Sequence, residues 1–372
     1  MWRKLVVAGL ALVFAIGCDE GTTTPGNDPE PAVFAMTNAS ANAVVMHHRS
    51  PDGTLTQGRS FATQGTGTGA NLGSQGALIL SDDLRFLLAA NAGSDDVTVF
   101  RLVADSLEFI QKIASGGDMP VSITHHGDRI YVLNAGGAGN ITGFRMESDG
   151  RLTALALSRP LSGAASTMPA QVEFSNDGSL LVVTEKATNT IVTYNVDANG
   201  DAGQPSTRTS VGQTPFGFAF APSGTLIVSE AFAPGGNALP NASAMSSYTV
   251  ESAGNLAVIS ASVPTTETAA CWVVVTGDGA FAYTSNTGSN SITGYSIGSG
   301  GTLTILTANG VTANSGGSMP VEMALSEDSE FLYVLNTGDG QVGAFRIGTD
   351  GSLTALGNTG GLPSNAYGLA AW

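Results

Sequence analysis

Residues 320–353 read PVEMALSEDSEFLYVLNTGDGQVGAFRIGTDGSL, and they contain every element of a unit that recurs along the chain. The first apolar segment opens at a proline, the second ends in Asn336, the third carries Phe345, and an Asp-Gly turn leads into the fourth. Short apolar segments that alternate with Gly- and Asp-containing turns are typical of antiparallel strands joined by hairpins. The stretch therefore predicts one small sheet of four antiparallel strands.

The second segment of this unit is recognisable seven times, with successive copies about 50 residues apart. Four short strands in each of seven repeats are typical of a β-propeller, whose ring leaves few free sheet edges. The first copy, at 33–38, lacks an inner strand, while residues 366–371 form a surplus one. We predict an all-β, seven-bladed β-propeller over residues 33–372, with four-stranded antiparallel blades and the C-terminal inner strand closing the first blade. The seven copies end at Asn38, Asn91, Asn134, Glu185, Glu230, Asn286 and Asn336.

The composition excludes several classes of protein. The chain has 372 residues, 14 Lys and Arg against 30 Asp and Glu, a formal net charge of −16, and 49 glycines. Nucleic-acid binding needs clustered basic residues that neutralise phosphates, and no such cluster is present. The apolar residues occur in short bursts, which excludes both a polytopic membrane protein and a disordered chain.

The N-terminus predicts the cellular location. Two basic residues precede an apolar run at 5–16, and the following Gly17-Cys18 resembles the end of a bacterial lipobox. We predict a lipoprotein signal peptide at 1–18, acylation of Cys18, and a flexible linker at 19–32 that is rich in Thr, Pro, Gly and acidic residues. The protein would then be exported to the cell envelope, periplasmic or outer-surface, and touch the membrane only through its lipid. The alternative is an ordinary signal peptide with a chance cysteine.

The Asn-terminated strands, the aromatic residue of the following strand and the Asp-Gly-x-Leu hairpins resemble those of the seven-bladed lactonase family. That family includes propeller-type 6-phosphogluconolactonases and carboxymuconate lactonizing enzymes. The resemblance extends over nearly all of residues 33–372 and implies the propeller fold. It also implies that an active member would be a lactonase, a carboxylic-ester hydrolase that acts on lactones.

The family's catalytic pattern is only partly present. Active members carry a Pro-Arg-His motif on a central inner strand and an Asn-Glu pair at the end of the next strand. The resemblance implies that Arg binds the lactone's acidic group while His and Glu move protons. Here Pro169 is kept, but Ala170 stands at the Arg position and Gln171 at the His position. Glu185 falls at the Asn position and Lys186 at the Glu position, so the set is not retained.

Five polar or aromatic residues are candidates for lining a pocket. Glu185 and Glu230 replace the Asn of the other repeats, either as plain caps of the strand turn or as an acidic pocket for a cation or sugar near one rim. Gln171, Trp272 and Glu322 share the inner strands, which flank the central channel of a propeller. This set is more typical of a binding surface than of a catalytic constellation.

No metal site or cofactor is predicted. The histidines occur as the adjacent pairs 47–48 and 125–126, and neighbours on a strand point to opposite sides. With Cys18 acylated, Cys271 has no partner for a disulfide, so a buried and inert thiol is expected.

The sequence leaves two functions open. The first is a monomeric, lipid-anchored binding or scaffold module whose ligand is an unidentified small molecule or envelope protein, with no nucleic-acid partner. The insertion at 232–244 is a candidate contact loop for that role. The alternative is a lactone hydrolase or lactonizing enzyme with a rearranged site in the channel.

Overall fold

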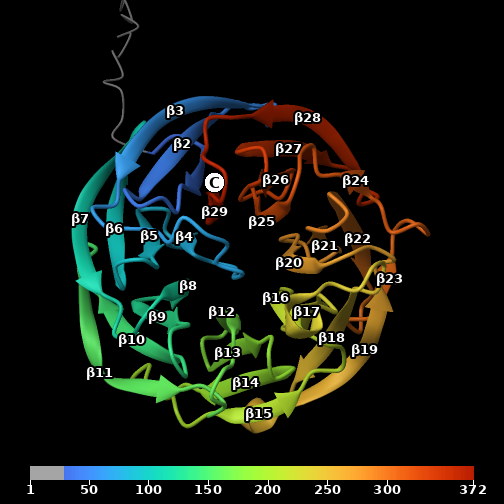
Figure 1. The fold of residues 1–372 in the computed structure, drawn as a ribbon, viewed down its shortest axis with the longest axis horizontal. Coiled ribbons are helices and arrows are strands. Elements are labelled where there is room, and N and C mark those ends of the chain that lie inside the picture. The colour runs from blue at the N-terminus through green and yellow to red at the C-terminus, as the bar shows by residue number, and fades with distance from the viewer. Residues whose placement is uncertain (1–28) are drawn as a thin grey trace, which may run out of the picture.

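The computed structural model describes residues 29–372, and its regular structure consists of strands apart from the short 3-10 turns η1 (Pro234–Gly236) and η2 (Ser252–Gly254). Seven sheets stand around a central axis like the blades of a propeller (Figure 1). Each blade contains an inner strand, two middle strands and an outer strand that all pair antiparallel. The predicted seven-bladed, four-stranded architecture is confirmed. The predicted signal peptide at 1–18, with its lipobox Cys18, and the linker up to residue 28 lie outside the described residues.

From the inner to the outer strand, the first three blades are β29 (Leu369–Ala371), β1 (Ala32–Met36), β2 (Ala43–Arg49), β3 (Leu55–Ala62); β4 (Leu78–Leu80), β5 (Phe86–Asn91), β6 (Asp96–Val103), β7 (Ser106–Ala114); and β8 (Pro120–His126), β9 (Arg129–Asn134), β10 (Asn140–Met146), β11 (Leu152–Pro160). The next two are β12 (Pro169–Phe174), β13 (Leu180–Glu185), β14 (Thr190–Asn195), β15 (Ser206–Thr209); and β16 (Pro215–Phe220), β17 (Leu226–Glu230), β18 (Ala244–Val250), β19 (Leu256–Pro264). The last two are β20 (Ala270–Val275), β21 (Phe281–Asn286), β22 (Ser291–Ile297), β23 (Leu303–Ile305), with β24 (Ala313–Asn314) also on β22; and β25 (Pro320–Leu325), β26 (Phe331–Asn336), β27 (Gln341–Ile347), β28 (Leu353–Thr359).

The first blade is shared by the two ends of the described chain. Strand β29 pairs antiparallel with β1, so that Phe34 lies opposite Ala370. This confirms the predicted closure, although β29 begins at Leu369 and is shorter than the predicted 366–371. Gly368 has a φ of +93°, a left-handed conformation that breaks the strand before Leu369.

The residues that define the repeat hold neighbouring blades together. The Tyr131 hydroxyl donates to the Gly200 carbonyl of the next blade at 2.9 Å, and Tyr333 donates in the same way to Gly53 at 3.1 Å. Gly53 has a φ of +89°, and a Cβ there would lie 2.2 Å from the Phe331 ring. The tyrosine and the Asp-Gly hairpin are therefore contacts between blades, as expected for residues that build the fold.

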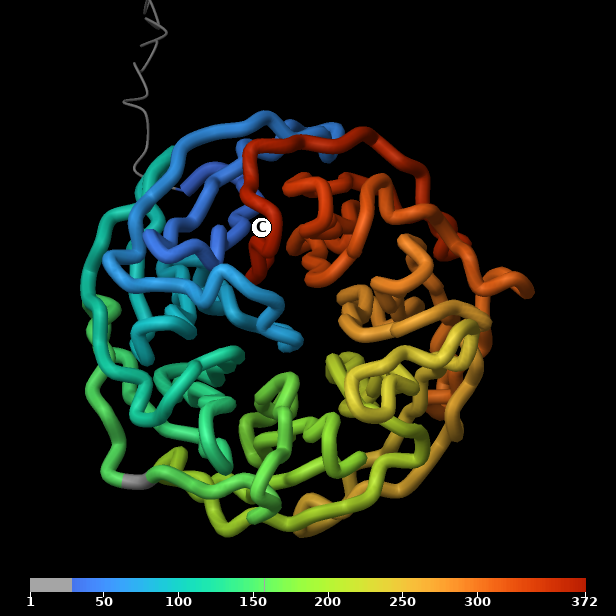
Figure 2. The backbone as a smooth tube through the Cα atoms, in the orientation of Figure 1, coloured from blue at the N-terminus to red at the C-terminus, as the bar shows by residue number. Residues whose placement is uncertain are grey.

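A segment that we call the plug, residues 70–76, runs from the β3–β4 connection to the channel axis (Figure 2). Gln75 exchanges two hydrogen bonds with the backbone of Val273 on β20, at 2.7 and 2.9 Å. The Gln75 N–H donates to the Ala170 carbonyl of β12, and the Trp272 indole donates to the Ser74 carbonyl at 2.7 Å. The plug is thus fixed to inner strands on two different sides of the channel.

Within residues 29–372, no helix has the length and apolar character needed to cross a membrane.

Candidate functional site

The plug lies between two cavities of similar size. Residues 71–73 line one of about 520 Å³, together with Lys186, and we call it the lysine cavity. Gln75 and Gly76 line the other, of about 500 Å³, together with Asp82, Glu173 and Glu322, and we call it the carboxyl cavity. The lysine cavity opens on the face where inner strands such as β12 and β20 begin, and the carboxyl cavity on the face where β8 and β12 end.

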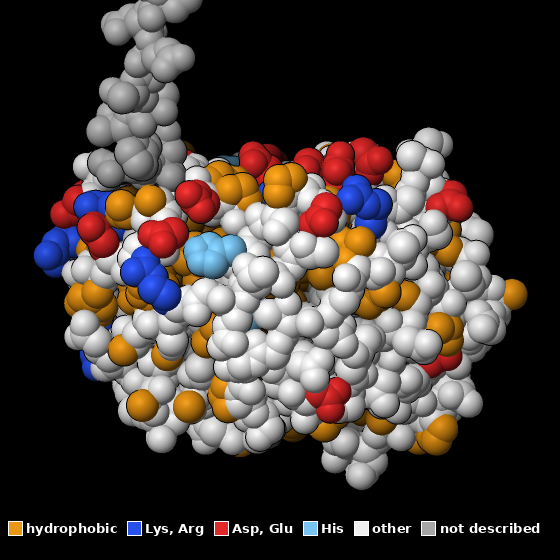
Figure 3. Space-filling model, turned by 90° about the horizontal axis from the view of Figure 1, so that it is seen from above, with side chains coloured by type: hydrophobic (Ala, Val, Ile, Leu, Met, Phe, Trp, Pro, Cys, Tyr) orange, Lys and Arg blue, Asp and Glu red, His pale blue; other side chains and the backbone are white. Residues whose placement is uncertain are grey.

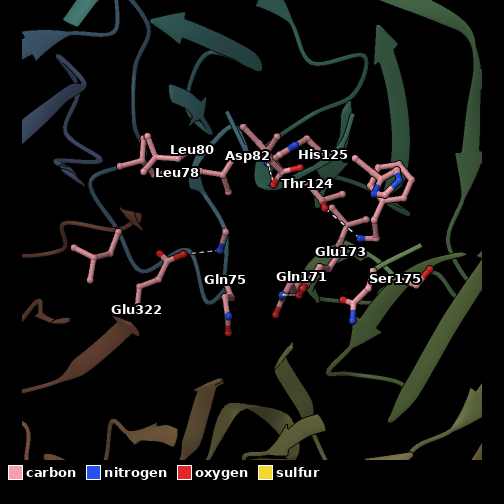
Figure 4. Close-up of a pocket in the computed structure, with 18 of the residues that line it drawn as sticks. Gln75, Leu78, Leu80, Asp82, Thr124, His125, Gln171, Glu173, Ser175 and Glu322 are labelled. Atoms are coloured by element: carbon pink, nitrogen blue, oxygen red, sulfur yellow. Dashed lines mark hydrogen bonds and ion pairs between the residues drawn. The ribbon is translucent and has the colours of Figure 1, made fainter. Parts of the chain in front are cut away.

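The carboxyl cavity contains an imidazole–carboxylate pair and the partly buried acid Glu173 (Figure 4). Asp82 lies on the β4–β5 turn, and its Oδ1 is 3.3 Å from Nε2 of His125 at the end of β8. Gln171 donates from Nε2 to Glu173 at 2.7 Å. Burial raises the pKa of Glu173 to about 8, so this side chain is largely a neutral acid at pH 7.

Glu322 reaches from β25 to the plug. Its carboxylate oxygens accept hydrogen bonds from the backbone N–H of Gly76 and from that of Gly368, the latter at 2.8 Å. Burial raises its pKa to about 8 in spite of these donors. Glu322 lines the carboxyl cavity, and both of its oxygen atoms fix the plug and the closing strand.

Gln171 is used in a similar way. Its side chain exchanges hydrogen bonds with both the N–H and the C=O of Phe218 on the neighbouring inner strand β16, at 2.7 and 2.9 Å. Gln171 therefore joins β12 to β16 in addition to holding Glu173. The position that the family fills with His carries a link between blades in this chain.

Among the described residues, the lysine cavity has mostly apolar walls, the neutral polar side chains of Asn71, Thr214 and Thr287, and one amine. Lys186 follows β13, and its Nζ donates to the Gly73 carbonyl of the plug and lies 3.5 Å from the Pro169 carbonyl. The same nitrogen lies 4.6 Å from the centre of the Phe216 ring. Burial lowers the pKa of Lys186 to about 8. Among the described residues that line this cavity there is no carboxylate and no imidazole.

The aromatic floor of the lysine cavity includes Trp272. Its ring centre lies 4.9 Å from that of Phe216 and 6.3 Å from that of Tyr367, and only 2% of the residue is exposed. Cys271 precedes it on β20, and burial raises the pKa of its thiol to about 12. That thiol stays protonated at neutral pH and is a poor nucleophile.

Glu185 and Glu230 lie at the ends of β13 and β17 and line neither cavity. Both are fully buried. Glu185 accepts hydrogen bonds from the N–H and hydroxyl of Ser162 at 2.8 and 2.7 Å. Glu230 accepts from the Gly212 N–H at 2.9 Å and from the hydroxyl of Ser262.

Asparagine at the equivalent position of other blades has the opposite polarity, because Asn336 donates to the Ser315 carbonyl at 2.9 Å. Glutamate therefore occurs in two blades where the preceding loop offers donors, whereas Asn134 and Asn336 face a loop carbonyl that accepts. Burial raises the pKa of Glu230, and its hydrogen-bond donors oppose this effect.

The described histidines and acids do not form a metal-binding cluster. His47 is fully buried with neither ring nitrogen hydrogen-bonded, and burial lowers its pKa to about 4, as suits a packing residue. Over residues 29–372, no three His, Cys, Asp or Glu side chains come together as a metal site would need.

The structure thus divides the five sequence candidates. Gln171 and Glu322 share the carboxyl cavity, Trp272 lines the lysine cavity, and the two glutamates at strand ends lie apart from both. Lys186, which stands at the Glu position of the family pattern, is not among these five candidates. One signal could have found it, because only three of the 372 residues are lysine.

The two faces also differ in charge. In the side view of Figure 3, most of the visible acidic and basic side chains lie along one flat face of the disc. The hairpins after the first and third strands of the blades meet on the face onto which the carboxyl cavity opens. Their exposed carboxylates include Asp52, Asp83, Asp149, Asp177, Asp328 and Asp350.

Comparisons with known proteins agree with this architecture. The family model described as Lactonase, 7-bladed beta-propeller, matches residues 28–159, 137–231 and 242–366. The comparison with curated proteins finds no match.

Several solved structures share the fold. A putative 6-phosphogluconolactonase from Bacteroides uniformis has 14% identity and a TM-score of 0.74, with 93% of this chain and 100% of that chain covered. The periplasmic gluconolactonase PpgL of Pseudomonas aeruginosa has 18% identity and a TM-score of 0.71, with 91% and 98% covered. A protein from Lactobacillus plantarum has 17% identity and a TM-score of 0.73, with 93% and 100% covered. At these identities the likeness shows the fold alone.

Proposed function

The chain belongs to the family of seven-bladed β-propeller lactonases, and from this premise we propose that it binds a small ligand in the lysine cavity without hydrolysing a lactone there. The observation that carries this proposal is which residues stand at the positions of the family's catalytic residues. Ala170 is buried and apolar, and Gln171 is bonded to the next blade. Lys186 is the one amine among the described residues that line the cavity.

Hydrolysis needs a group that takes a proton from water and one that donates to the leaving oxygen. An amine with a lowered pKa can supply one of these groups. The neighbouring thiol of Cys271 stays protonated at neutral pH and supplies no base. A concave cavity with mostly apolar walls and a few polar groups is the usual form of a small-molecule binding site.

The test is hydrolysis of a panel of γ- and δ-lactones by the full chain, beside Lys186→Met and His125→Gln variants. We expect no turnover above the uncatalysed rate. Turnover lost in Lys186→Met would overturn the proposal. Turnover lost in His125→Gln would instead place a lactonase at the carboxyl cavity, where the Asp82–His125 pair supports the alternative function.

The proposal includes export and lipid anchoring through Cys18. It is supported by the basic and apolar N-terminus of the sequence and by a fold neighbour whose name describes a periplasmic gluconolactonase. Expression in a bacterium followed by detergent phase partition tests it. We expect the wild type in the detergent phase and Cys18→Ser in the aqueous phase. Equal partition of the two proteins would overturn the anchor.

A further inference from the structure

Two lysines lie in the part of the chain that the structure describes, and their surroundings differ. Lys112, on the outer strand β7, lies 3.5 Å from a carboxylate oxygen of Asp96 and donates to the Gln64 carbonyl at 2.8 Å. Lys186 has no carboxylate within ion-pair distance among residues 29–372, and its amine lies inside a cavity. The described chain therefore contains a half-buried amine inside a cavity and an exposed amine with which it can be compared.

The contacts of Lys186 with the described residues provide acceptors but no counter-ion. The backbone carbonyls of Gly73 and Pro169 lie within reach of Nζ, and the centre of the Phe216 ring lies 4.6 Å from it. The fraction of the amine that is neutral has the lone pair that attack on a carbonyl needs. The lowered pKa of about 8 means that about a tenth of the amine is unprotonated at pH 7.

The cavity around this amine favours an apolar occupant. Phe216 and Trp272 form its aromatic side, and the backbone and methyl groups of residues 231–238 form another. Met168 at its edge leaves 53% of its surface exposed, which gives the cavity a flexible apolar rim. A desolvated lysine in an apolar pocket is the arrangement that activates an amine for attack on a carbonyl carbon.

We propose that Lys186 captures a small apolar aldehyde in the lysine cavity as a reversible imine. This inference rests on the proposed function, because it names the ligand class of the same cavity. The lone pair of Nζ forms a bond to the carbonyl carbon while the C=O π pair moves to oxygen. A proton then passes from nitrogen to oxygen to give a carbinolamine. The remaining N–H proton and that hydroxyl then leave together as water, and the nitrogen pair forms the C=N bond. Addition of water reverses the sequence without any change of oxidation state.

The experiment is reductive trapping on the full chain with benzaldehyde and sodium cyanoborohydride at pH 8, followed by peptide mass mapping. A trapped lysine gains the mass of one benzaldehyde less one oxygen. We expect Lys186 to be labelled at least about ten times faster than Lys112 of the same molecule. Similar rates at the two lysines, or faster labelling of Lys112, would overturn the proposal.

Three controls keep the outcome unambiguous. Lys112→Arg leaves the labelling of Lys186 unchanged, and Lys186→Arg abolishes the fast label. Benzyl alcohol, which fits the same space but has no carbonyl, slows the labelling of Lys186 alone in the wild-type chain. A fast label that benzyl alcohol does not slow would show reaction outside the cavity and would also overturn the proposal. Lactone turnover measured on the same sample reports separately on the proposed function.

Discussion

The two cavities on either side of the plug have nearly equal volumes and opposite chemistry. The carboxyl cavity holds Glu173 and Glu322, acids whose pKa burial raises to about 8. The lysine cavity holds Lys186, a base whose pKa burial lowers to about 8. In both places desolvation favours the neutral form. The difference lies in how the polar atoms are used.

In the carboxyl cavity, most polar atoms are already bonded to the fold. Glu322 holds Gly76 and Gly368, and Gln171 holds Phe218. The lysine cavity is lined by the first residues of inner strands such as β16 and β20 and by connecting loops. The comparison indicates that a residue on an inner strand does not always contact a ligand. Its side chain can instead hydrogen-bond to a neighbouring inner strand, as Gln171 does, or to the residue just before one, as Glu322 does.

The largest change in stability is expected for a substitution that removes a contact of the plug, the segment between the two cavities. Trp272→Ala removes a ring buried against Phe216 and the hydrogen bond to Ser74. We expect the free energy of unfolding to fall by about 3–5 kcal/mol, as for other buried aromatic truncations. Denaturant unfolding at constant pH measures it. Trp272→Phe keeps the packing and should lose less, and a loss below about 1 kcal/mol in Trp272→Ala would contradict this account of the plug.

The next effect concerns the acids alone. Glu322→Gln turns an acceptor towards Gly368 into a donor, so we expect a loss of about 1–3 kcal/mol at pH 5. The folded protein keeps the proton of Glu322 up to about pH 8, while the unfolded chain loses it near 4.5. Wild-type stability therefore falls between pH 5 and 8, by up to about 1.4 kcal/mol per pH unit for this group. The variant should show a shallower fall, measured by unfolding at a series of pH values. Equal slopes would contradict the buried acid.

Lys186 should change the stability with pH in the direction opposite to Glu322. The pKa of Lys186 is about 8 in the folded protein and 10.5 as its ordinary value, so only the unfolded chain binds this proton in between. Between pH 8 and 10.5, wild-type stability should therefore rise relative to Lys186→Met, by up to about 1.4 kcal/mol per pH unit. Lys112→Met serves as the control. A constant difference between wild type and Lys186→Met would show that the amine is not desolvated.

The smallest change in stability is expected for a substitution at the exposed edge of the carboxyl cavity. Asp82 contacts His125 at 3.3 Å, but its side chain is 80% exposed. Exposed ion pairs contribute little to stability, so Asp82→Asn should change the free energy of unfolding by less than about 0.5 kcal/mol. A thermal unfolding scan detects a larger change, and a larger change would place this pair among the links that hold the fold.

Much of the fold could be predicted because the same sequence pattern recurs from blade to blade. Seven apolar strands that each end in a polar residue predict seven blades, and the surplus C-terminal strand predicts the closure that β29 and β1 make. The plug could not be predicted in this way. Its links to Ala170, Trp272 and Val273 use the backbone of Ser74 and Gln75 as well as one side chain, and residues 63–77 resemble any polar loop.

The candidate site was harder to predict from the sequence than the fold, for a related reason. Sequence places Gln171, Trp272 and Glu322 on inner strands correctly, but it does not show which of their atoms are bonded to a neighbouring blade. Nor does it show that the chain at 71–73 comes next to Lys186, more than a hundred residues away. These contacts depend on the closed ring.

Closing the ring also sets an order of events in biosynthesis. Of the described strands, β29 leaves the ribosome last, whereas its partner β1 leaves first. Until β29 arrives, β1 has an unpaired edge, and its residues Ala32–Met36, all buried in the finished ring, lack their cover. An unpaired apolar strand edge is a template for aggregation. Contacts between such distant parts of a chain also form slowly. The nascent propeller is therefore most vulnerable in the interval before its last strand arrives.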